Sequence, residues 1–478
     1  MAATVHPIRA LRRLVEYEPP RGCYDEAFSA AGQPRAAYSG ILACLEDGPP
    51  ARIAASVMSS LTQHGVRFRS AAGDFTFPID PLPRILSVAE RAALSAGLAQ
   101  RAEALNAFVG DVYGERRIVA AGQVPERLIS ESKMYEPLMQ GVGDPGGTFA
   151  HLAGPDLVRD ANGDFLVLED NLRSPSGLAY ALEARRTLAA ELPLAHFEPL
   201  PIEGAIERLR GALWAAAPEG VAEPRVVVLS DGPSSPAWFE HWSLARRLEI
   251  PLVTGGDLRV SGGRVWSGGD GVRIPVDVIF RRTAEERLER DDGRLTPLGE
   301  LLVEPIRAGT VAVANAFGTG VADDKLAHAY VETMIRFYLG EEPLLGSVAT
   351  LDLGERADRS QALERLDEMV VKRRSGLGGG EVHILSAADR DEREHVAAMI
   401  RQSPQDFIAQ EEVQLSTHPT VVGDRLEPRR VDLRPFVIRD SVGYVTTRAA
   451  LTRYAPRSDS MYVNSSLGGG GKDTWVVA

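Results

Sequence analysis

The segment DLVRDANGDFLVLEDN, which begins at Asp156, combines oxygen-bearing side chains with a strong turn signal. Asn162-Gly163 favours a tight hairpin turn between two strands. Because side chains alternate along a strand, Glu169 and Asn171 would share one face, and the turn would bring Asp156 beside them. A few hard oxygen ligands suit Mg²⁺, which usually retains water. We therefore predict a magnesium site here; the alternative is an ordinary hairpin with a solvated polar face.

A second group of residues lies far downstream. A short apolar run ends in Lys372 and is followed at once by a glycine-rich loop. Free backbone N–H groups in such a loop can surround phosphate oxygens, and a neighbouring lysine supplies the matching charge. The pattern indicates a nucleotide site, although a flexible turn is the more frequent use of such glycines. The loop glycines are Gly376, Gly378, Gly379 and Gly380.

Two further apolar strands carry polar residues. In the run FIAQEEV, Gln410, Glu411 and Glu412 follow the strand and offer acceptors for an adenine amino group. In the run VDLRPF, Arg434 lies two residues after Asp432, so both share one strand face. Taken alone, an arginine in a strand is usually solvated. The order of the whole set is what favours a nucleotide site.

These parts occur in the order of an ATP-grasp enzyme whose metal pair comes first in the chain instead of last. The chain resembles the circularly permuted ATP-grasp proteins, a large bacterial family related to glutathionylspermidine synthetase. The likeness includes LEDNLRSPSG (168–177), GVADDK (320–325) and VNSSLGGGGKDTW (463–475), and it covers nearly the whole chain. It implies a mixed α+β and α/β fold, the circularly permuted ATP-grasp fold, with ATP and Mg²⁺ as cofactors.

The resemblance also assigns roles to charged residues. Lys325 is similar to the first ATP lysine of the family and Lys372 to the second, and together they would neutralise a triphosphate while it is positioned. Lys325 would open a helix, where the helix dipole disfavours a cation, and this conflict favours a functional role. Arg434 would contact the γ-phosphate or an acyl phosphate. Asp432 would hold Arg434 or share the metal, and Arg453 is a second candidate.

The loop after Lys372 departs from the family pattern. The family tends to have a proline and an acidic or polar residue before the glycines, where this chain has Arg373 and Arg374. Glu381 follows the glycines, where a small or basic residue is more usual. These differences leave the phosphate contacts of the loop open.

Substrate-binding residues are expected around the same site. Arg281 and Arg282 follow a predicted strand at the end where open α/β sheets bind ligands, so they could hold a substrate carboxylate; a solvent-facing basic pair is the alternative. His151 and His418 lack a second histidine at metal-ligand spacing and would be pocket or structural residues. Lys472 follows four glycines that lack Walker A spacing, and would add charge to an anion loop facing the metal hairpin. Arg173 and Ser176 complete the substrate candidates.

Composition narrows the class of protein. A chain of 478 residues has room for about three domains, and 44% hydrophobic content allows well-filled cores. The net charge of −13 argues against a nucleic-acid partner, which would require a basic face. We recognise neither a signal peptide nor a transmembrane run, and therefore expect a cytoplasmic protein without a membrane partner. The sequence leaves the oligomeric state open.

Pattern changes along the chain indicate its organisation. A helix is expected from the capping-box pair Ser87 and Glu90 as far as Gly114. The later alternation of strands and helix indicates a Rossmann-like unit, but without G-x-G-x-x-G we expect no dinucleotide. The expected segments are 1–22 (peripheral), 23–118 (mostly helical), 119–200 (metal hairpin), 201–315 (Rossmann-like) and 316–478 (the nucleotide-binding portion).

The resemblance implies a class of reaction more firmly than it implies substrates. ATP-grasp ligases transfer the γ-phosphoryl group of ATP to a carboxylate, and an amine then attacks the acyl phosphate to give an amide. We therefore expect a carboxylate–amine ligase whose partners are a small-molecule or peptide carboxylate and an amine. The alternatives are a small-molecule kinase of ATP-grasp type and a non-catalytic nucleotide-binding regulator. The presence of the metal set together with both lysines disfavours the regulator.

Overall fold

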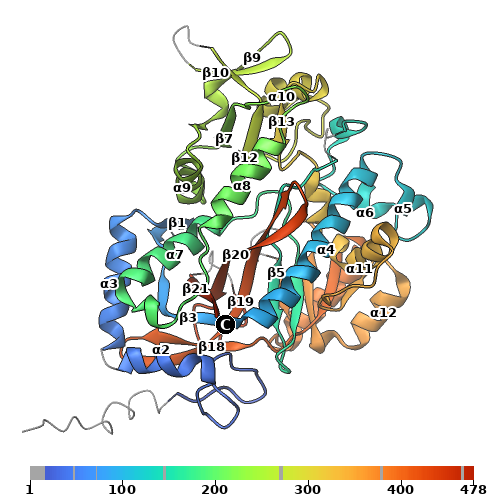
Figure 1. Cartoon of the computed structure of the whole chain (residues 1–478). Helices are drawn as coiled ribbons and strands as arrows, with labels where there is room; N and C mark the ends of the chain where they lie inside the picture. Colours follow the sequence, from blue (N-terminus) through green and yellow to red (C-terminus); the bar gives the residue numbers. More distant parts are fainter. Residues whose placement is uncertain are drawn as a thin grey trace, which may run out of the picture.

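The computed structural model describes residues 17–46, 49–70, 73–143, 147–268, 273–376, 381–463 and 468–477. The fold is mixed α/β, with one eight-stranded and two four-stranded sheets among helices (Figure 1). None of the described helices combines the length and the apolar character that a bilayer crossing requires.

The eight-stranded sheet joins segments from both ends of the chain. β21 pairs in parallel with β3 and antiparallel with β20, so strands drawn in blue and in dark red lie side by side in Figure 1. β18 and β4 both pair with β19. The strand order is β3 (Ile79–Ser87), β21 (Gly470–Val477), β20 (Gly443–Tyr454), β19 (Arg425–Asp440), β5 (Asp156–Arg159) and β6 (Phe165–Glu169), with β18 (Thr417–Val422) and β4 (Leu152–Ala153) at the side.

β5 and β6 form the predicted hairpin. Asp156 lies opposite Glu169 in the antiparallel register. Gly163 in the turn has a φ of 94°, a backbone conformation that glycine adopts without strain. The register shifts between Asp156 and Leu157, next to the residues expected to bind metal. The hairpin geometry inferred from the Asn-Gly turn is therefore confirmed.

A four-stranded parallel sheet forms the part of the molecule drawn in green at the top of Figure 1. It lies within the segment in which the sequence shows alternating strands and helix. Its order is β13 (Ala312–Ala314), β12 (Val278–Arg282), β7 (Val226–Ser230) and β8 (Leu252–Val253). The same segment contains α8 (Gly204–Ala215), α9 (Trp238–Leu248), α10 (Pro297–Arg307) and the small sheet of β9 (Leu258–Ser261), β10 (Arg264–Ser267) and β11 (Ile274–Val276).

The second four-stranded sheet is antiparallel and carries the nucleotide candidates. Its inner strands are neighbours, with Lys372 opposite Ile408 and Val370 opposite Gln410. The strand that carries Lys372 and the strand that runs into Gln410, Glu411 and Glu412, which we call the hinge residues, therefore lie side by side. The sheet order is β14 (Thr350–Asp352), β17 (Phe407–Glu411), β15 (Met369–Arg373) and β16 (Val382–Ile384), with helices α11 (Lys325–Leu339), α12 (Arg356–Glu364) and α13 (Arg390–Gln402).

The segment before the hairpin is rich in helices, and α4 (Val88–Val112) begins with the predicted capping box of Ser87 and Glu90. It also contains strands that the sequence did not indicate. β3 is buried along almost its whole length, and it lies at the edge of the sheet, the position where prolines such as Pro81 and Pro83 are tolerated in a strand. The other helices and strands that precede or follow the hairpin in this part of the sequence are α2 (Ala36–Glu46), α3 (Pro50–Gln63), β1 (Arg67–Ser70), β2 (Gly73–Thr76), α5 (Arg117–Ala120), α6 (Arg127–Ser130) and α7 (Leu178–Glu191).

Candidate active site

Residues from all three larger sheets line one cavity of about 620 Å³. A cavity of this size is in the usual range for ligand sites. Most of the side chains predicted from the sequence contribute to it. They are Asp156, Glu169, Asn171, Arg173, Ser176, Arg282, Lys325, Lys372, Gly376, Gln410, Glu411, Glu412, Asp432, Arg434 and Arg453.

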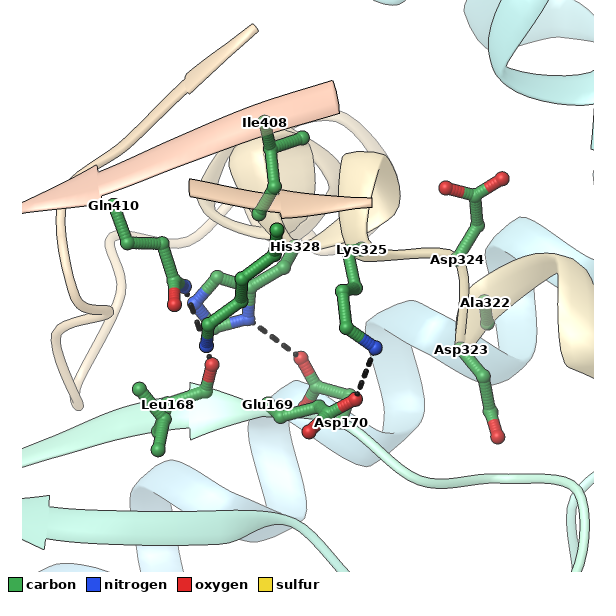
Figure 2. A pocket seen from close by; sticks show the side chains of 11 residues that line it. Leu168, Glu169, Asp170, Ala322, Asp323, Asp324, Lys325, His328, Ile408 and Gln410 are labelled. Carbon is green, nitrogen blue, oxygen red and sulfur yellow. Dashed lines mark hydrogen bonds and ion pairs between the residues drawn. The ribbon is translucent and has the colours of Figure 1, made fainter. Parts of the chain in front are cut away.

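Asp170 anchors the end of the metal hairpin through contacts with Arg101 and His328. Arg101 donates from Nε and Nη2 to the two carboxylate oxygens of Asp170, at 2.7 Å each. Nδ1 of His328 lies 3.2 Å from the same carboxylate, as Figure 2 shows. Burial alone would raise the pKa of Asp170, but the guanidinium of Arg101 holds this pKa well below its usual value. Asp170 thus does not line the large cavity, as strand alternation predicts, and borders only a small adjoining one, whereas Glu169 and Asn171 line the large cavity.

Lys325 connects the hairpin to the glycine loop. It is the first residue of α11, whose N-cap is Asp324. Its Nζ donates to Oε1 of Glu169 and to the carbonyl oxygen of Gly376, each at 2.9 Å. Figure 2 shows Lys325 reaching from the helix to Glu169. Burial would raise the pKa of Glu169, but Lys325 and then Lys372 lower it, so this carboxylate is held in its charged form.

Lys372 lies on β15 and is only 8% exposed. Burial lowers the pKa of its ammonium group to about 8, against the opposing influence of Glu169. A buried ammonium group of this kind is stabilised by an anionic ligand. Lys325 and Lys372 also line a small adjoining cavity together with Glu169. The two lysines, distant in sequence, therefore meet at one site.

The arginines that depart from the family pattern do not act as one pair. Arg374 is buried and donates from Nε and Nη2 to the carboxylate of Asp324, at 3.1 Å each. It therefore fixes the start of α11, where Lys325 stands. Arg373 instead pairs with Glu381 at 3.3 Å. The predicted loop residues Gly378, Gly379 and Gly380 lie outside the described residues.

The hinge residues offer unused acceptors to the cavity. Gln410 donates from Nε2 to Oγ1 of Thr350 at 3.0 Å. Among the described residues, its buried Oε1 finds no hydrogen-bond partner, and neither does Oε2 of Glu412. A buried acceptor without a partner is costly unless a ligand supplies the donor. Both atoms therefore fit a ligand with an amino group, such as adenine, whereas Glu411 pairs with Arg365 at 3.2 Å.

The arginine centre differs from the predicted pairing. Arg434 donates from Nε and Nη2 to the two oxygens of Asp156, at 2.6 and 2.7 Å. Asp432 holds Arg453, not Arg434: Nε of Arg453 donates to its Oδ1 at 2.9 Å. The expectation that Asp432 holds Arg434 is therefore wrong, because Arg453 lies directly opposite Asp432 on β20. Arg453 also lies 3.0 Å from Oδ2 of Asp156.

The pKa values of the two carboxylates of this centre shift in opposite directions. Burial raises the pKa of Asp432, although Arg453 opposes the change. Burial acts in the same direction on Asp156, but Arg434 and Arg453 lower its pKa below the ordinary value. The surroundings therefore favour the charged form of Asp156 more strongly than that of Asp432.

The hairpin residues fit a magnesium ion that also uses substrate oxygens. Asp156 and Glu169 supply carboxylates, and Asn171 donates from Nδ2 to the carbonyl oxygen of Gly154 at 3.2 Å, which leaves its Oδ1 as a ligand. Within the described part of the chain, no cluster of three or more His, Cys, Asp or Glu side chains could hold a metal. The donor set thus matches Mg²⁺ completed by water and phosphate oxygens, not a closed protein cage.

Lys472 lies outside the cavity, contrary to the prediction. Its side chain is fully buried and donates to Oδ1 of Asp80 at 2.5 Å and to the carbonyl oxygen of Pro419 at 3.0 Å. Of the four glycines before it, Gly470 and Gly471 begin strand β21, and residues 464–467 of the expected anion loop lie outside the described residues. That strand pairs with β3 and sets Lys472 opposite Asp80. The shared-cleft prediction for Lys472 is therefore wrong.

Three other predicted residues also lie elsewhere. Arg281 is fully buried and donates from Nη1 to Oε2 of Glu286 at 2.8 Å, so only Arg282 of this pair lines the cavity. Side-chain alternation along β12 explains the difference. His151 is buried outside the cavity lining, and its pKa falls to about 4 because of burial. His418 is fully buried, with Nδ1 2.8 Å from the carbonyl oxygen of Pro419.

Asp323, which borders the small adjoining cavity, positions Arg173 at the large one. Asp323 accepts hydrogen bonds from the backbone N–H of Leu172 at 2.6 Å and from Nε of Arg173 at 3.0 Å, which fixes Arg173 at the cavity. Burial raises the pKa of Asp323 to about 6. Other lining residues come from elements far apart in the chain, with no shared spacing to reveal them. They include Phe68, Phe77, Tyr180, Ser235 and His241.

Comparisons with known proteins show what this chain is similar to. The sequence profile of the family "circularly permuted ATP-grasp type 2" matches residues 83–455. An uncharacterized protein of Synechocystis is 40% identical over 472 residues, which cover 96% of this chain and 98% of that protein. An uncharacterized protein of Mycobacterium leprae is 39% identical over 466 residues, or 95% of this chain and 82% of that protein.

Two further similarities concern proteins with more specific names. A Frankia alni protein named "Putative glutamate--cysteine ligase 2-3" is 42% identical over 475 residues, and this chain spans 54% of its length. A glutathione synthetase-like effector from Globodera pallida, solved in its apo form, superposes with a TM-score of 0.58. That match covers 89% of this chain and 97% of the effector at 12% sequence identity, and it therefore shows similarity of fold alone.

Proposed function

Because the chain belongs to the circularly permuted ATP-grasp type 2 family, we propose that it is an ATP- and Mg²⁺-dependent ligase that joins a carboxylate to an amine. One observation carries the proposal. Two lysines, the oxygen-bearing hairpin and two arginines line a single cavity although they come from distant parts of the sequence. This combination suits the transfer of a phosphoryl group to an anionic acceptor, in which positioning and charge neutralisation supply most of the catalysis.

In this proposal, the antiparallel four-stranded sheet binds the nucleotide. Lys372 and Lys325 contact the phosphates. The negative charge of the bound phosphates favours the ammonium form of Lys372. The unpartnered oxygens of Gln410 and Glu412 accept hydrogen bonds from the adenine amino group. Lys325 exchanges at least part of its contact with Glu169 for contact with phosphate.

The hairpin side chains Asp156, Glu169 and Asn171 would hold Mg²⁺ together with phosphate oxygens and water. When bound, the ion neutralises charge on the phosphates and orients them for in-line transfer. Arg434 and Arg453 keep Asp156 ionised and place positive charge beside the reacting groups. Arg173, held by Asp323, lines the same cavity and adds positive charge.

The reaction proceeds in two steps. A carboxylate oxygen of the acid substrate attacks the γ-phosphorus of ATP, and the bond to the β,γ-bridging oxygen breaks to release ADP. The amine nitrogen then attacks the carbonyl carbon of the acyl phosphate, phosphate leaves with the bonding electrons, and the nitrogen loses a proton. Arg434 and Arg453 stabilise the negative charge that these steps bring to the acyl phosphate and to the departing phosphate.

The name of the Frankia relative does not decide the substrates. This chain spans about half of that protein, so the activity in the name can belong to the half that has no counterpart here. We therefore propose the reaction class and leave the particular acid and amine to experiment.

The proposal is tested by following ATP consumption and phosphorus-containing products with pools of amino acids and peptides, with and without an amine. A ligase consumes ATP in quantity only when both acid and amine are present, and it releases ADP and inorganic phosphate. A kinase would accumulate a stable phosphorylated compound without the amine, and that outcome would overturn the proposal.

A further inference from the structure

The part of the cavity next to the parallel sheet differs chemically from the nucleotide part. It is lined by Phe68 from β1, Tyr180 from α7, Ser235 before α9, and Arg282 and Thr283 at the end of β12. α9 contacts both α7 and β1, which joins these walls, and the three elements lie together in Figure 1. Neither the lysines nor the metal hairpin explains this group of residues.

Arg282 is the charged residue of this region. Its side chain is 1% exposed, and its Nε is buried with no hydrogen-bond partner among the described residues. Its nearest acidic group, Oε1 of Glu240, lies 3.9 Å away, too far for a hydrogen bond. A buried guanidinium N–H group without a partner, such as this Nε, is costly to the folded protein. Such a group fits an anionic ligand that approaches it through the cavity.

Glu240 does not satisfy Arg282, because its carboxylate serves another purpose. It is fully buried and accepts hydrogen bonds from the backbone N–H groups at the start of α7: Gly177 at 2.9 Å, Leu178 at 3.2 Å and Ala179 at 3.3 Å. These contacts fix the helix that carries Tyr180. Glu240 also reduces the positive charge around Arg282, so the region suits a singly charged carboxylate better than a phosphate dianion.

Aromatic rings form the wall beside Arg282. Phe77 and Tyr180 lie 4.8 Å apart between ring centroids, and Phe68 lies 6.1 Å from Phe77. The Tyr180 hydroxyl donates to the backbone oxygen of Arg67 at 2.9 Å, which ties the β1–β2 hairpin to α7. The rings are therefore held by the surrounding structure and present an apolar surface to a ligand.

His241 adds a neutral polar group to this wall. Its Nδ1 lies 2.7 Å from the hydroxyl oxygen of Ser230. Burial, and then the charge of Arg282, lowers the pKa of His241 to about 3. The imidazole therefore adds no second positive charge at neutral pH.

We propose that this region, which we name the Arg282 subsite, binds a carboxylate that does not react, carried by a substrate with an apolar or aromatic group next to it. The reacting carboxylate would lie at Arg434 and Arg453, so the substrate would carry two separate carboxylates or be a peptide with an acidic group. The inference rests on the proposed ligase function. It adds a chemical class to one of the substrates: an amino acid or peptide with an apolar side chain and a carboxylate held at a distance from the reacting one.

A second hollow supports a substrate longer than a single small acid. It has a volume of about 360 Å³ and shares Ser235 and Pro236 with the main cavity. Its lining includes Trp238, Phe239 and Trp242, so apolar surface continues past the Arg282 subsite. An extended ligand could therefore run from the main cavity across Pro236 towards α9.

Binding of simple probes to the full-length protein tests the subsite without knowledge of the substrate. The probes are 3-phenylpropionate, its neutral isostere 3-phenylpropanamide, and propionate, measured by ligand-observed NMR. We expect 3-phenylpropionate to bind on the order of 10-fold more tightly than either other probe, because only it offers both the charge and the ring. Equal binding of the amide would overturn the proposal.

Matched variants locate the binding. Arg282→Met should weaken binding of 3-phenylpropionate on the order of 10-fold, whereas Arg434→Met should bind this probe with an affinity within about twofold of the wild type. If Arg434→Met loses affinity for 3-phenylpropionate while Arg282→Met retains it, the carboxylate binds at the reacting centre. That result would overturn the subsite. Circular dichroism and affinity for a non-hydrolysable ATP analogue show whether each variant is folded.

The aromatic wall has its own matched pair. Phe68 and Phe75 face each other across the β1–β2 hairpin, but only Phe68 lines the cavity. Phe68→Ala should weaken binding of 3-phenylpropionate, and Phe75→Ala should not. The same effect in both variants would contradict contact between the aromatic wall and the probe. If the wild-type protein binds the probe through Arg282 but neither binds ATP nor forms an amide, the proposed function fails while the subsite stands.

Discussion

Arg434 on β19 holds Asp156 on β5 through two parallel hydrogen bonds, from Nε to Oδ1 at 2.6 Å and from Nη2 to Oδ2 at 2.7 Å. The two residues are distant in sequence but belong to adjacent strands of the eight-stranded sheet. Asp156 is also a proposed metal ligand. In the proposed ligase, an arginine and a magnesium ion would therefore contact the same carboxylate.

This geometry predicts that Arg434 cannot be replaced by lysine. Lysine keeps the charge but lacks the planar fork that contacts both oxygens of Asp156. We expect Arg434→Lys to lower turnover by on the order of 100-fold, and Arg434→Met by at least as much, with little change in affinity for an ATP analogue. Steady-state rates of ADP release measure the effect. Near-normal turnover in Arg434→Met would remove Arg434 from the reacting centre.

The shared cavity predicts that Lys325 and Lys372 act on one triphosphate. Replacing either lysine by methionine should weaken binding of a non-hydrolysable ATP analogue. The double variant should lose less than the sum of the two single losses in binding free energy, because neighbouring groups acting on one ligand are not independent. Isothermal titration calorimetry gives all three affinities. Normal affinity in both single variants would contradict the nucleotide assignment.

The lowered pKa of Lys372 predicts a pH dependence of nucleotide binding. Since burial lowers this pKa to about 8, the free protein loses the charge of Lys372 as the pH rises through 8, whereas bound triphosphate favours the charged form. Affinity should be constant below about pH 7 and fall above pH 8, with uptake of a proton on binding. Calorimetry in buffers of different ionisation enthalpy detects that proton. In Lys372→Arg the decline should disappear, and a decline that persists would implicate another group.

The position of Lys472 predicts a structural role. Lys472→Met would leave Asp80 buried without its ion-pair partner, which costs about 3–5 kcal/mol of unfolding free energy. Removing both charges, with Asp80→Asn added, should recover part of that loss. Urea unfolding of the variants measures it. Unchanged stability together with loss of ATP turnover would instead favour a catalytic Lys472.

The local motifs predicted the hairpin and indicated two lysines that the structure brings to one cavity, because their signals lie in short stretches. The Asn-Gly turn set the hairpin in which Asp156 opposes Glu169, and side-chain alternation indicated that Asp170 faces away. Ser87 and Glu90 indicated where α4 begins. Each of these features depends on neighbours in sequence.

Features that depend on distant partners were missed or misplaced. The glycines before Lys472 favour a loop, but pairing with β3 and β20 makes the last two, Gly470 and Gly471, part of a strand that carries Lys472 away from the cavity. Strand alternation predicts a contact between Asp432 and Arg434, because both lie on one strand face, yet the neighbouring strand brings Arg453 to Asp432. The wall formed by Phe68 and Tyr180 exists only once separate elements pack together, so no local pattern could indicate it.

The central claim is that this protein forms an acyl phosphate, and capture with hydroxylamine tests it most directly. The protein is incubated with ATP, Mg²⁺, hydroxylamine and pools of amino acids and peptides, and products are identified by mass spectrometry. We predict an acyl hydroxamate formed in equal amount to ADP with at least one acid, and its loss in Glu169→Gln. Consumption of ATP that yields a stable phosphorylated compound and no hydroxamate would contradict the account.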